Sequence, residues 1–265
     1  MTSLSLSQAK HIRALHTKKY RDKHKAFLVE GRKSIEEFIK EGWACLHYVV
    51  QETTQPINGL REVLRITDKK TFKSISALSN ASDHLAVFQC KDRMMKEDFP
   101  IWLALDHLQD PGNLGTIIRT MDWFGCQSLI LSEGCVDVFN PKVIQASMGS
   151  VSRVAVQQAD RKEWQKIFGM RHVLFADLEG VPFSSEELAR EISPKNHLSP
   201  LVLVIGNEGN GIHPSTRTML SHTSITIPRG GYPLSNAESL NAAMATGILL
   251  SYFSSKLAEG NAANH

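Results

Sequence analysis

Three short segments of this sequence carry polar side chains whose types and spacing suit the binding and orientation of a polar ligand. They lie at residues 113–119, 206–211 and 239–241, and each follows or opens an element that otherwise has the apolar pattern of an α/β core. Together they supply amide, carboxylate, hydroxyl and guanidinium groups, which can hold a substrate and stabilise charge that develops on it. Because α/β domains keep their sites at such element ends, we expect the three segments to form one site.

The first segment, DPGNLGTIIRT at residues 110–120, begins with a Pro-Gly turn directly after an apolar strand predicted at residues 101–106. Asn113 stands at the expected N-cap of a helix, where its side chain can close the first turn. Arg119 lies away from the apolar stripe that the following helix carries at helical spacing. The alternative interpretation is a capped helix with one ordinary surface arginine.

The second segment, GNEGNG at residues 206–211, follows the most apolar predicted strand of the chain. Glycines there let a backbone loop approach a ligand closely, and Glu208 places a carboxylate inside that loop. The glycine order G-x-x-G-x-G reverses the dinucleotide fingerprint, which disfavours a nicotinamide-dependent enzyme, and no phosphate-loop motif is present. The alternative is a plain glycine turn with a solvated glutamate.

The third segment opens the last predicted helix, at residues 239–257. Ser239 can cap this helix, or Ser239 and Asn241 can turn polar groups towards a ligand. The histidines are scattered, and His107, which lies close to the first segment, is the one candidate among them.

The chain as a whole divides into two parts with different patterns. Residues 1–90 predict a small three-layer α/β unit that begins with a basic helix at about residues 5–18. A charged stretch that ends at a proline indicates a linker at residues 91–99. Strands and helices then alternate, which predicts an α/β domain with a mainly parallel sheet at residues 100–258, before a frayed tail at residues 259–265.

Basic residues are concentrated near the start of the chain, although the net charge is only +3. Residues 9–33 hold nine lysines and arginines, three histidines and two acids, and such a segment can follow a phosphate backbone. Lys18, Lys19, Arg21 and Arg32 are the candidate contacts to such a nucleic-acid backbone. The alternative is a solvated helix face.

The sequence predicts neither secretion, nor membrane insertion, nor a metal centre. Its first ten residues, MTSLSLSQAK, lack the apolar stretch of a signal peptide, and no apolar run approaches the roughly 20 residues that span a bilayer. The four cysteines show no C-x-x-C spacing, and we expect them to be buried thiols. The expected location is the cytoplasm, where thiols stay reduced.

In this order and spacing the three segments are similar to the signature motifs of a known family. DHLQDPGNLGTIIRTMDWFG, LVLVIGNEGNGI and ITIPRG…ESLNAAMATGILL together resemble the SpoU/TrmH family, the 2′-O-ribose methyltransferase branch of the SPOUT superfamily. The resemblance covers residues 100–257. Residues 1–90 resemble the substrate-binding extension of the ribosomal-RNA members, which has a ribosomal-protein-like α/β fold.

The resemblance implies an α/β fold with a deep trefoil knot near its carboxyl end, a homodimer, and S-adenosylmethionine as the methyl donor. The implied reaction is methyl transfer to a ribose 2′-hydroxyl of RNA, with 23S ribosomal RNA favoured. Arg119 matches the catalytic arginine, as a general base or as an electrostatic stabiliser of the alkoxide. The other implied catalytic positions are Asn113, Glu208, Ser239 and Asn241. The implied cofactor contacts are Gly206, Asn207, Gly211, Ile227 and Leu240.

One segment departs from the family pattern. The link at residues 228–238 is longer than usual and contains a second Ser-Asn pair, Ser235 and Asn236, to which the polar role can slide. Its place near the implied knot affects the expected cofactor geometry. Two alternatives to the leading interpretation are a transfer-RNA 2′-O-methyltransferase and a non-catalytic RNA-binding protein that acts in ribosome assembly.

Overall fold

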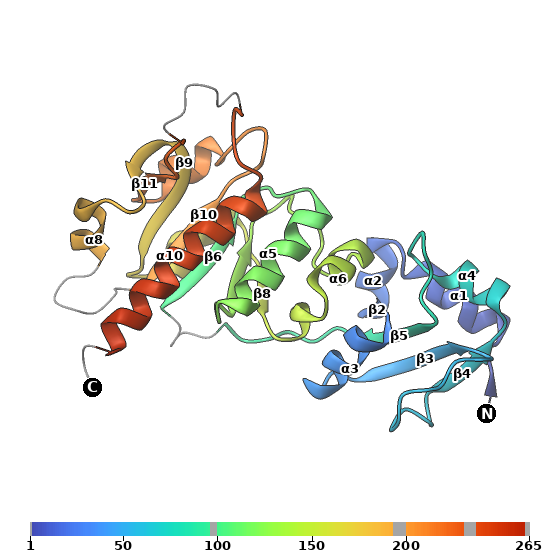
Figure 1. The fold of residues 1–265 in the computed structure, drawn as a ribbon. Coiled ribbons are helices and arrows are strands. Elements are labelled where there is room, and N and C mark those ends of the chain that lie inside the picture. The colour runs from blue at the N-terminus through green and yellow to red at the C-terminus, as the bar shows by residue number, and fades with distance from the viewer. Residues whose placement is uncertain (1, 96–99, 193–199, 231–236, 263–265) are drawn as a thin grey trace. The chain divides into compact units, whose positions relative to one another are not determined.

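The computed structural model describes the chain except for residues 1, 96–99, 193–199, 231–236 and 263–265 (Figure 1). The contacts divide it into two compact units. Unit 1 comprises Met1–Asp92, Leu114–Arg119 and Asp137–Arg153, and unit 2 comprises Arg93–Asn113, Thr120–Val136 and Val154–His265. The expected linker at 91–99 and tail at 259–265 lie partly outside the described residues, so these domain boundaries stay predictions.

Unit 1 is built on one mixed sheet. Its strands are β1 (Thr2–Ser3), β2 (Ala26–Glu30), β3 (Cys45–Gln51), β4 (Leu64–Thr67) and β5 (His84–Gln89). Their order across the sheet is β1-β4-β3-β5-β2, with β3 parallel to β4 and antiparallel to β5. The sequence does not predict β1 and β4, because such short strands show no clear period.

Helices cover both faces of this sheet. They are α1 (Leu6–Ala14), α2 (Lys18–His24), α3 (Arg32–Lys40), α4 (Lys69–Ile75) and α6 (Pro141–Ser147), followed by the 3₁₀ turn η1 (Ser150–Ser152). Ile12 of α1 and Phe72 of α4 share a core with Val87 on one face. Phe38 of α3 packs against Phe88, the next residue of the same strand, whose side chain points to the other face. Unit 1 therefore has the three layers that its sequence predicts (Figure 1).

The basic segment forms two helices rather than the single one expected at residues 5–18. The chain turns after α1, and Thr17 begins α2 in an extended conformation. Arg21 of α2 is only 3% exposed. Its Nε and Nη2 donate to Oδ2 of Asp137 at 2.9 and 2.7 Å, and its Nη1 donates to the carbonyls of Leu15 and His16. The prediction that Arg21 contacts RNA is therefore wrong, because its guanidinium is bound inside unit 1.

We expect Arg21→Met to lower the free energy of unfolding by about 3 kcal/mol or more, because it leaves a carboxylate in a largely buried position without its cation. Asp137 is 14% exposed in this pair. The matched control is Lys18→Met, which removes an exposed pair with Asp22 on the same helix and should cost about 1 kcal/mol or less. Urea unfolding of the two variants measures the difference. Equal effects would contradict a structural role for Arg21.

Unit 2 is built on a six-stranded sheet in which every neighbouring pair is parallel. Its strands are β6 (Ile101–Leu105), β7 (Ser128–Leu131), β8 (Ala155–Gln158), β9 (His172–Pro182), β10 (Leu201–Ile205) and β11 (Thr223–Thr226). The order is β11-β9-β10-β6-β7-β8, so the two central strands, β10 and β6, are almost wholly apolar and buried. The predicted mainly parallel α/β sheet is confirmed.

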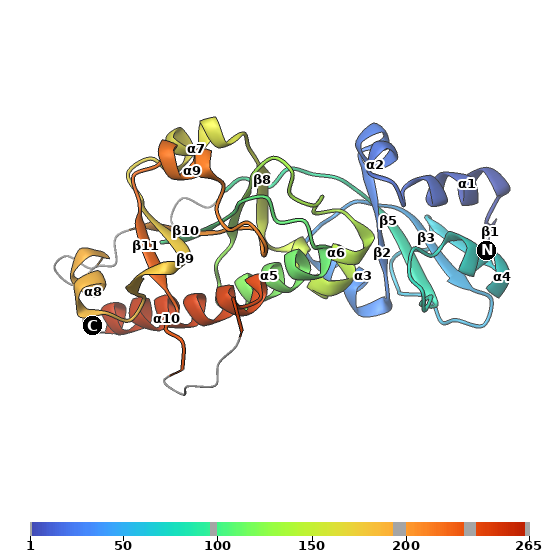
Figure 2. The ribbon, with the colours of Figure 1, turned by 90° about the horizontal axis from the view of Figure 1, so that it is seen from above.

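The helices of unit 2 include two that run side by side. They are α7 (Arg161–Phe168), α8 (Glu186–Ile192), α9 (Pro214–Met219), α10 (Ala242–Ala262) and the two ends of α5 (Pro111–Trp123), whose residues Leu114–Arg119 group with unit 1. α5 and α10 start together, where Asn241 contacts Asn113, and Gly247 lies against Thr120 further along. They therefore run parallel, as the two ribbon views show (Figure 1, Figure 2).

No helix in the described part of the chain is long and apolar enough to cross a membrane. The four cysteines are free thiols; Cys126 is buried and the other three are half-buried. Burial raises the pKa of Cys126 to about 12. At neutral pH this thiol is therefore protonated and packs as an apolar group.

Candidate active site

The three polar segments meet beside the carboxyl ends of β6 and β10. These strands are neighbours, with Leu105 opposite Ile205 at their ends. Asn113 on α5 donates from Nδ2 to Oε1 of Glu208 at 2.5 Å, and Asn241 donates from Nδ2 to Oδ1 of Asn113 at 2.9 Å. Two hydrogen bonds thus join one residue from each segment, in a row.

The N-cap of α5 is Asp110, whose Oδ1 accepts from the backbone amide of Asn113 at 2.7 Å. The prediction that Asn113 caps this helix is therefore wrong. Proline is favoured at the first helical position, so Pro111 moves the cap to the residue before it. The consequence is functional, because the Asn113 side chain is released from capping and reaches Glu208 and Asn241.

Asn241 caps α10, while Ser239 does not. Oδ1 of Asn241 accepts from the backbone amides of Ala243 and Met244 at 2.9 and 3.3 Å, and Nδ2 of Asn241 is left to donate to Asn113. Both interpretations of this segment thus apply to one residue, which caps a helix and faces the site. Ser239 is exposed and lines the cleft described below.

The direction of these hydrogen bonds is fixed at both ends of the row. Helix amides can only donate and a carboxylate can only accept, so Asn241 must present its oxygen to α10 and its amide to Asn113. By the same reasoning Asn113 must present its own amide to Glu208. The row therefore connects the positive end of α10 to the Glu208 carboxylate. It holds that exposed carboxylate in one orientation.

The glycine-rich loop after β10 is rigid for reasons visible in its backbone. Asn207 and Gly211 exchange two backbone hydrogen bonds, at 2.9 and 2.8 Å, and Oδ1 of Asn207 accepts from the amides of Gly209 and Asn210. The loop folds back so tightly that a Cβ on Gly206 would lie 2.2 Å from the carbonyl carbon of Gly211. Only glycine fits there, and Glu208 projects from a loop with one shape.

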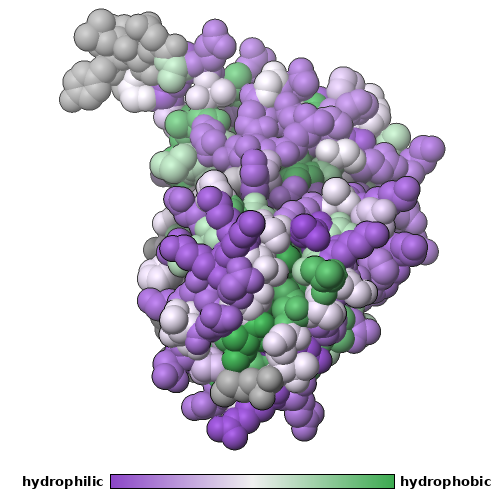
Figure 3. Space-filling view, turned by 90° about the vertical axis from the view of Figure 1, so that its right-hand side faces the viewer, coloured by the Kyte–Doolittle hydropathy of each residue, from purple (hydrophilic) through white to green (hydrophobic). Residues whose placement is uncertain are grey.

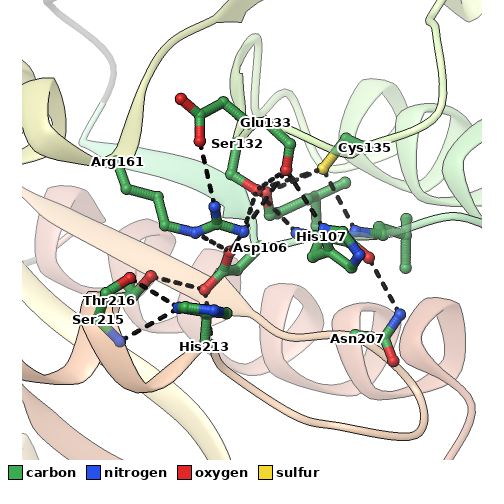
Figure 4. A network of polar contacts seen from close by, with 12 residues as sticks. Asp106, His107, Ser132, Glu133, Cys135, Arg161, Asn207, His213, Ser215 and Thr216 are labelled. Atoms are coloured by element: carbon green, nitrogen blue, oxygen red, sulfur yellow. Dashed lines mark hydrogen bonds and ion pairs between the residues drawn. The ribbon is translucent and has the colours of Figure 1, made fainter.

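A buried carboxylate lies beneath this loop (Figure 4). Asp106 follows β6 and has no exposed surface. Its Oδ1 accepts from Nε of Arg161 at 2.7 Å, and its Oδ2 accepts from Oγ1 of Thr216 at 2.7 Å and from the amide of His213 at 2.9 Å. Burial by itself would raise the pKa of Asp106, but the bonds from Thr216, His213 and Arg161 outweigh it and lower the pKa. Asp106 therefore stays ionised and ties α7 and α9 to the end of β6.

Sequence reasoning missed this network. The sequence feature that could have revealed the network is Asp106, a charged residue directly after a five-residue apolar strand. His107, the histidine nearest to the first segment, contributes its backbone. Its carbonyl accepts from Nδ2 of Asn207 at 3.0 Å, and its amide donates to Oγ of Ser132 at 2.8 Å. These bonds attach the glycine-rich loop to the neighbouring strands.

A cleft of about 780 Å³ opens beside the glycine-rich loop, large enough for a cofactor-sized ligand. Apolar side chains such as Ile205, Ile225 and Leu249 line it together with backbone of the loop, and Asp177 and Arg217 form an ion pair in its wall. These groups suit a ligand that has both apolar and polar or charged parts. The predicted cofactor positions all line this cleft: Gly206, Asn207, Gly211, Ile227 and Leu240.

Arg119 is exposed on α5, six residues after Asn113 and about 9 Å further along the helix axis. The structure describes no ion pair between Arg119 and another residue of the described chain. The alternative site residues Ser235 and Asn236 lie outside the described residues. Within the described residues, the side-chain amide of Asn241 is hydrogen-bonded to Asn113.

Comparison with known proteins identifies the family. The model of the SpoU rRNA Methylase family matches residues 100–251, more than half of the chain. The chain belongs to the SpoU rRNA methylase family. A second model, the MRM3-like substrate binding domain, matches residues 7–86. The predicted family is confirmed by these two matches.

Relatives of this SpoU-family chain are similar along almost its whole length. The 23S rRNA 2′-O-methyltransferase RlmP of Bacillus subtilis (strain 168) is 28% identical over 255 residues, covering 92% of this chain and 94% of the relative. A TrmH-family structure from Porphyromonas gingivalis is 34% identical, with a TM-score of 0.78 and coverage of 94% and 98%. An rRNA methyltransferase from Sinorhizobium meliloti with bound S-adenosylmethionine is 29% identical, with a TM-score of 0.76 and coverage of 94% and 95%.

These relationships confirm the predicted enzyme class, an RNA 2′-O-methyltransferase that uses S-adenosylmethionine. They also confirm RNA as the substrate of this SpoU-family chain. The deep trefoil knot implied by the resemblance stays a prediction.

We expect Asp106→Asn to destabilise the protein by about 3 kcal/mol at neutral pH, because Arg161, 12% exposed, would lose its buried anion. The folded-state pKa of Asp106 lies below its usual value of 3.8. The stabilisation is thus fully present above that value and is lost as the pH falls through the folded-state pKa. The difference in the free energy of unfolding between wild type and variant should decrease only below about pH 4.

Urea unfolding over a pH series measures this difference. Asp160→Asn is the comparison variant, because it removes a carboxylate that is not buried and that caps α7, and asparagine caps a helix about equally well. A fully stable Asp106→Asn protein at neutral pH would show that the network does not stabilise unit 2.

Proposed function

We propose that this chain transfers the methyl group of S-adenosylmethionine to a ribose 2′-hydroxyl of 23S ribosomal RNA, the substrate named for the Bacillus relative. The observation that carries the proposal is the row formed by Asn241, Asn113 and Glu208 at the edge of the cofactor-sized cleft. It fixes a carboxylate at the place where the sequence motifs of a methyltransferase converge. The cytoplasmic location remains a prediction.

The chemistry assigns different tasks to the cofactor and to the chain. The cofactor supplies a methyl group on a positively charged sulfur, so the chain must align the 2′-hydroxyl and assist the loss of its proton. We assign Arg119 to the reacting oxygen. An arginine keeps its proton, with a reference pKa above about 12, so stabilisation of the developing alkoxide is the role that suits it.

The remaining polar residues orient the reacting groups. Asn113 and Asn241 fix the Glu208 carboxylate, whose second oxygen is available to a ribose hydroxyl or to an arginine. Ser239 is exposed beside them and offers a hydroxyl to the same ligand. A carboxylate that is already oriented costs little reorganisation when the substrate binds, which supports catalysis by positioning.

We assign the cleft to S-adenosylmethionine. The tight loop, in which Gly206 contacts the backbone of Gly211 and Gly211 has a positive φ of 65°, presents its backbone to the cofactor. Ile227 and Leu240 approach from the segments after β11 and before α10. Asn207 acts from inside the loop, because its side chain bonds the loop amides and the His107 carbonyl.

We assign Lys18, Lys19 and Arg32 to RNA binding. All three are exposed on unit 1. Lys18 pairs with Asp22 and Arg32 pairs with Glu36, each within one exposed helix. Such exposed pairs are weak, so a phosphate group can replace the carboxylate at little cost.

We expect Arg119→Ala to lower methyl transfer by about a hundredfold or more and to leave cofactor affinity nearly unchanged, because Arg119 serves the transition state. Transfer from labelled S-adenosylmethionine to unmethylated ribosomal and transfer RNA, mapped for 2′-O-methyl positions, measures the first effect. Calorimetry measures the second. Arg190→Ala, which removes an exposed arginine on α8, is the control.

Each outcome of this assay decides between candidate functions. Labelled methyl groups in 23S ribosomal RNA support the proposal. Labelled methyl groups found in transfer RNA alone would show that the substrate is transfer RNA instead. Cofactor binding lost together with transfer would show that Arg119 belongs to the cofactor site. If the wild-type protein binds RNA but neither binds the cofactor nor transfers label to any RNA, it is a non-catalytic RNA-binding protein.

We further propose that the chain acts as a homodimer. Trp123 of α5 and Met244 and Ile248 of α10 are 83%, 62% and 36% exposed. They belong to two helices that run side by side, and grouped exposed apolar side chains are typical of an interface. Sedimentation equilibrium should give twice the chain mass of 29.5 kDa. Met244→Lys should shift the mass towards the monomer, and a monomeric wild type would contradict the proposal.

A further inference from the structure

Three histidines of unit 1 gather on the face of the sheet that α1 covers. His11 comes from α1, His24 ends α2, and His47 lies on β3, two residues before the core residue Val49. The ring of His11 lies edge-on to that of His24 with centroids 4.6 Å apart, and 6.2 Å from that of His47. Tyr20 stacks on His24 at 6.2 Å, with the rings 9° from parallel. We call these four residues the imidazole cluster.

The groups that shift the pKa values of His11 and His47 are basic, and no carboxylate among the described residues forms an ion pair with either ring. Burial, and then the charge of His24, lower the pKa of His11. Burial, and then the charges of His11 and Arg65, lower the pKa of His47. The groups that act on these two rings from α1, α2, β3 and the neighbouring β4 are therefore all basic.

Two observations indicate that the imidazole cluster can accept a ligand. Nδ1 of His47 is buried, and no group among the described residues bonds it. Tyr20 and His24 are exposed. The face of the molecule in Figure 3 is hydrophilic around a central hydrophobic patch. Among the described residues, no group of three or more His, Cys, Asp or Glu side chains is arranged to hold a metal ion.

We propose that the imidazole cluster binds a phosphate group of the RNA substrate and takes up protons when it does so. The proposal rests on the proposed function, since it requires that unit 1 contact ribosomal RNA. A phosphate beside His11, His24 and His47 would supply the negative charge that the cluster lacks. Tyr20 adds an aromatic face on which a base can stack. Lys18, Lys19 and Lys23 are exposed on α2, the helix that carries Tyr20 and His24, and favour a polyanion over a neutral partner.

The sign of the pH dependence follows from these charges. In the free protein the pKa values of His11 and His47 lie below the usual histidine value, so both rings are mainly neutral at neutral pH. A bound phosphate favours their charged forms and raises the same pKa values. The complex then holds more protons than the free protein, and RNA affinity rises as the pH falls. Each proton taken up changes the affinity by up to about tenfold per pH unit.

The test is RNA affinity as a function of pH, measured by fluorescence anisotropy with a labelled, unmethylated 23S ribosomal RNA transcript. Wild-type affinity should rise at least about fivefold between about pH 8 and pH 6. The double variant His11→Gln, His24→Gln should lose most of this rise and should bind at the higher pH with similar affinity. Circular dichroism of the variant checks that unit 1 is folded.

The matched control is Lys18→Gln, Lys19→Gln, on the same helix as His24. Lysines stay charged across this range, so the control should bind more weakly at every pH and keep the wild-type slope. Calorimetry in two buffers of different ionisation enthalpy should show proton uptake by the wild type and less by the histidine variant.

The outcomes separate this inference from the proposed function. Wild-type protein that methylates ribosomal RNA, while the histidine variant keeps the full pH slope, overturns the inference and leaves the function in place. Absence of methyl transfer by the wild type on any RNA overturns the function. Equal proton uptake by wild type and variant also overturns the inference, and would assign the cluster to a partner other than RNA.

Discussion

The ion pair between Asp106 and Arg161 is the contact on which the site of unit 2 depends. A carboxylate with no exposed surface must be paired, and Asp106 meets this need with a guanidinium, a hydroxyl and a backbone amide from α7 and from the start of α9. These partners lie on segments that follow β8 and β10. The end of β6 is thereby joined to the elements on both sides of it, and the glycine-rich loop between β10 and α9 is held at its two ends.

Upon this base the catalytic groups are arranged by the parallel course of α5 and α10. Both helices begin at the same level, so the cap of one can bond the third residue of the other. The displacement of the α5 cap to Asp110 makes this possible, because Asn113 then has an amide for Glu208 and an oxygen for Asn241. Capping, usually a local matter of helix stability, here transmits the polarity of α10 to a carboxylate beside the cofactor cleft.

Unit 1 shows that burial, more than residue type, decides what a basic side chain does. Arg21 and Lys18 lie three residues apart on α2, yet Arg21 is bound to Asp137 while Lys18 forms only an exposed pair. The imidazole cluster lies between these extremes, since its rings are partly buried among other basic groups. A fixed internal pair stabilises the unit, exposed lysines provide charge at every pH, and the histidines add charge that depends on what they bind.

The sequence by itself determined the parallel sheet of unit 2, because β6 and β10 are continuous apolar runs. It also located the polar segments and, through their order and spacing, the family and its chemistry. Tertiary structure alone decided which of these residues are partners: Asn113 meets Glu208 from 95 residues away and Asn241 from 128, and Arg21 meets Asp137 from 116. Local periodicity and capping rules report only on neighbours within a few turns, which is why Asn113 was expected to cap its helix and Arg21 to face RNA. The buried network of Asp106 and the imidazole cluster arise from the same long-range packing. Local sequence marks Asp106 as a charged residue after an apolar strand, but it does not specify the partners of Asp106 or of the histidines.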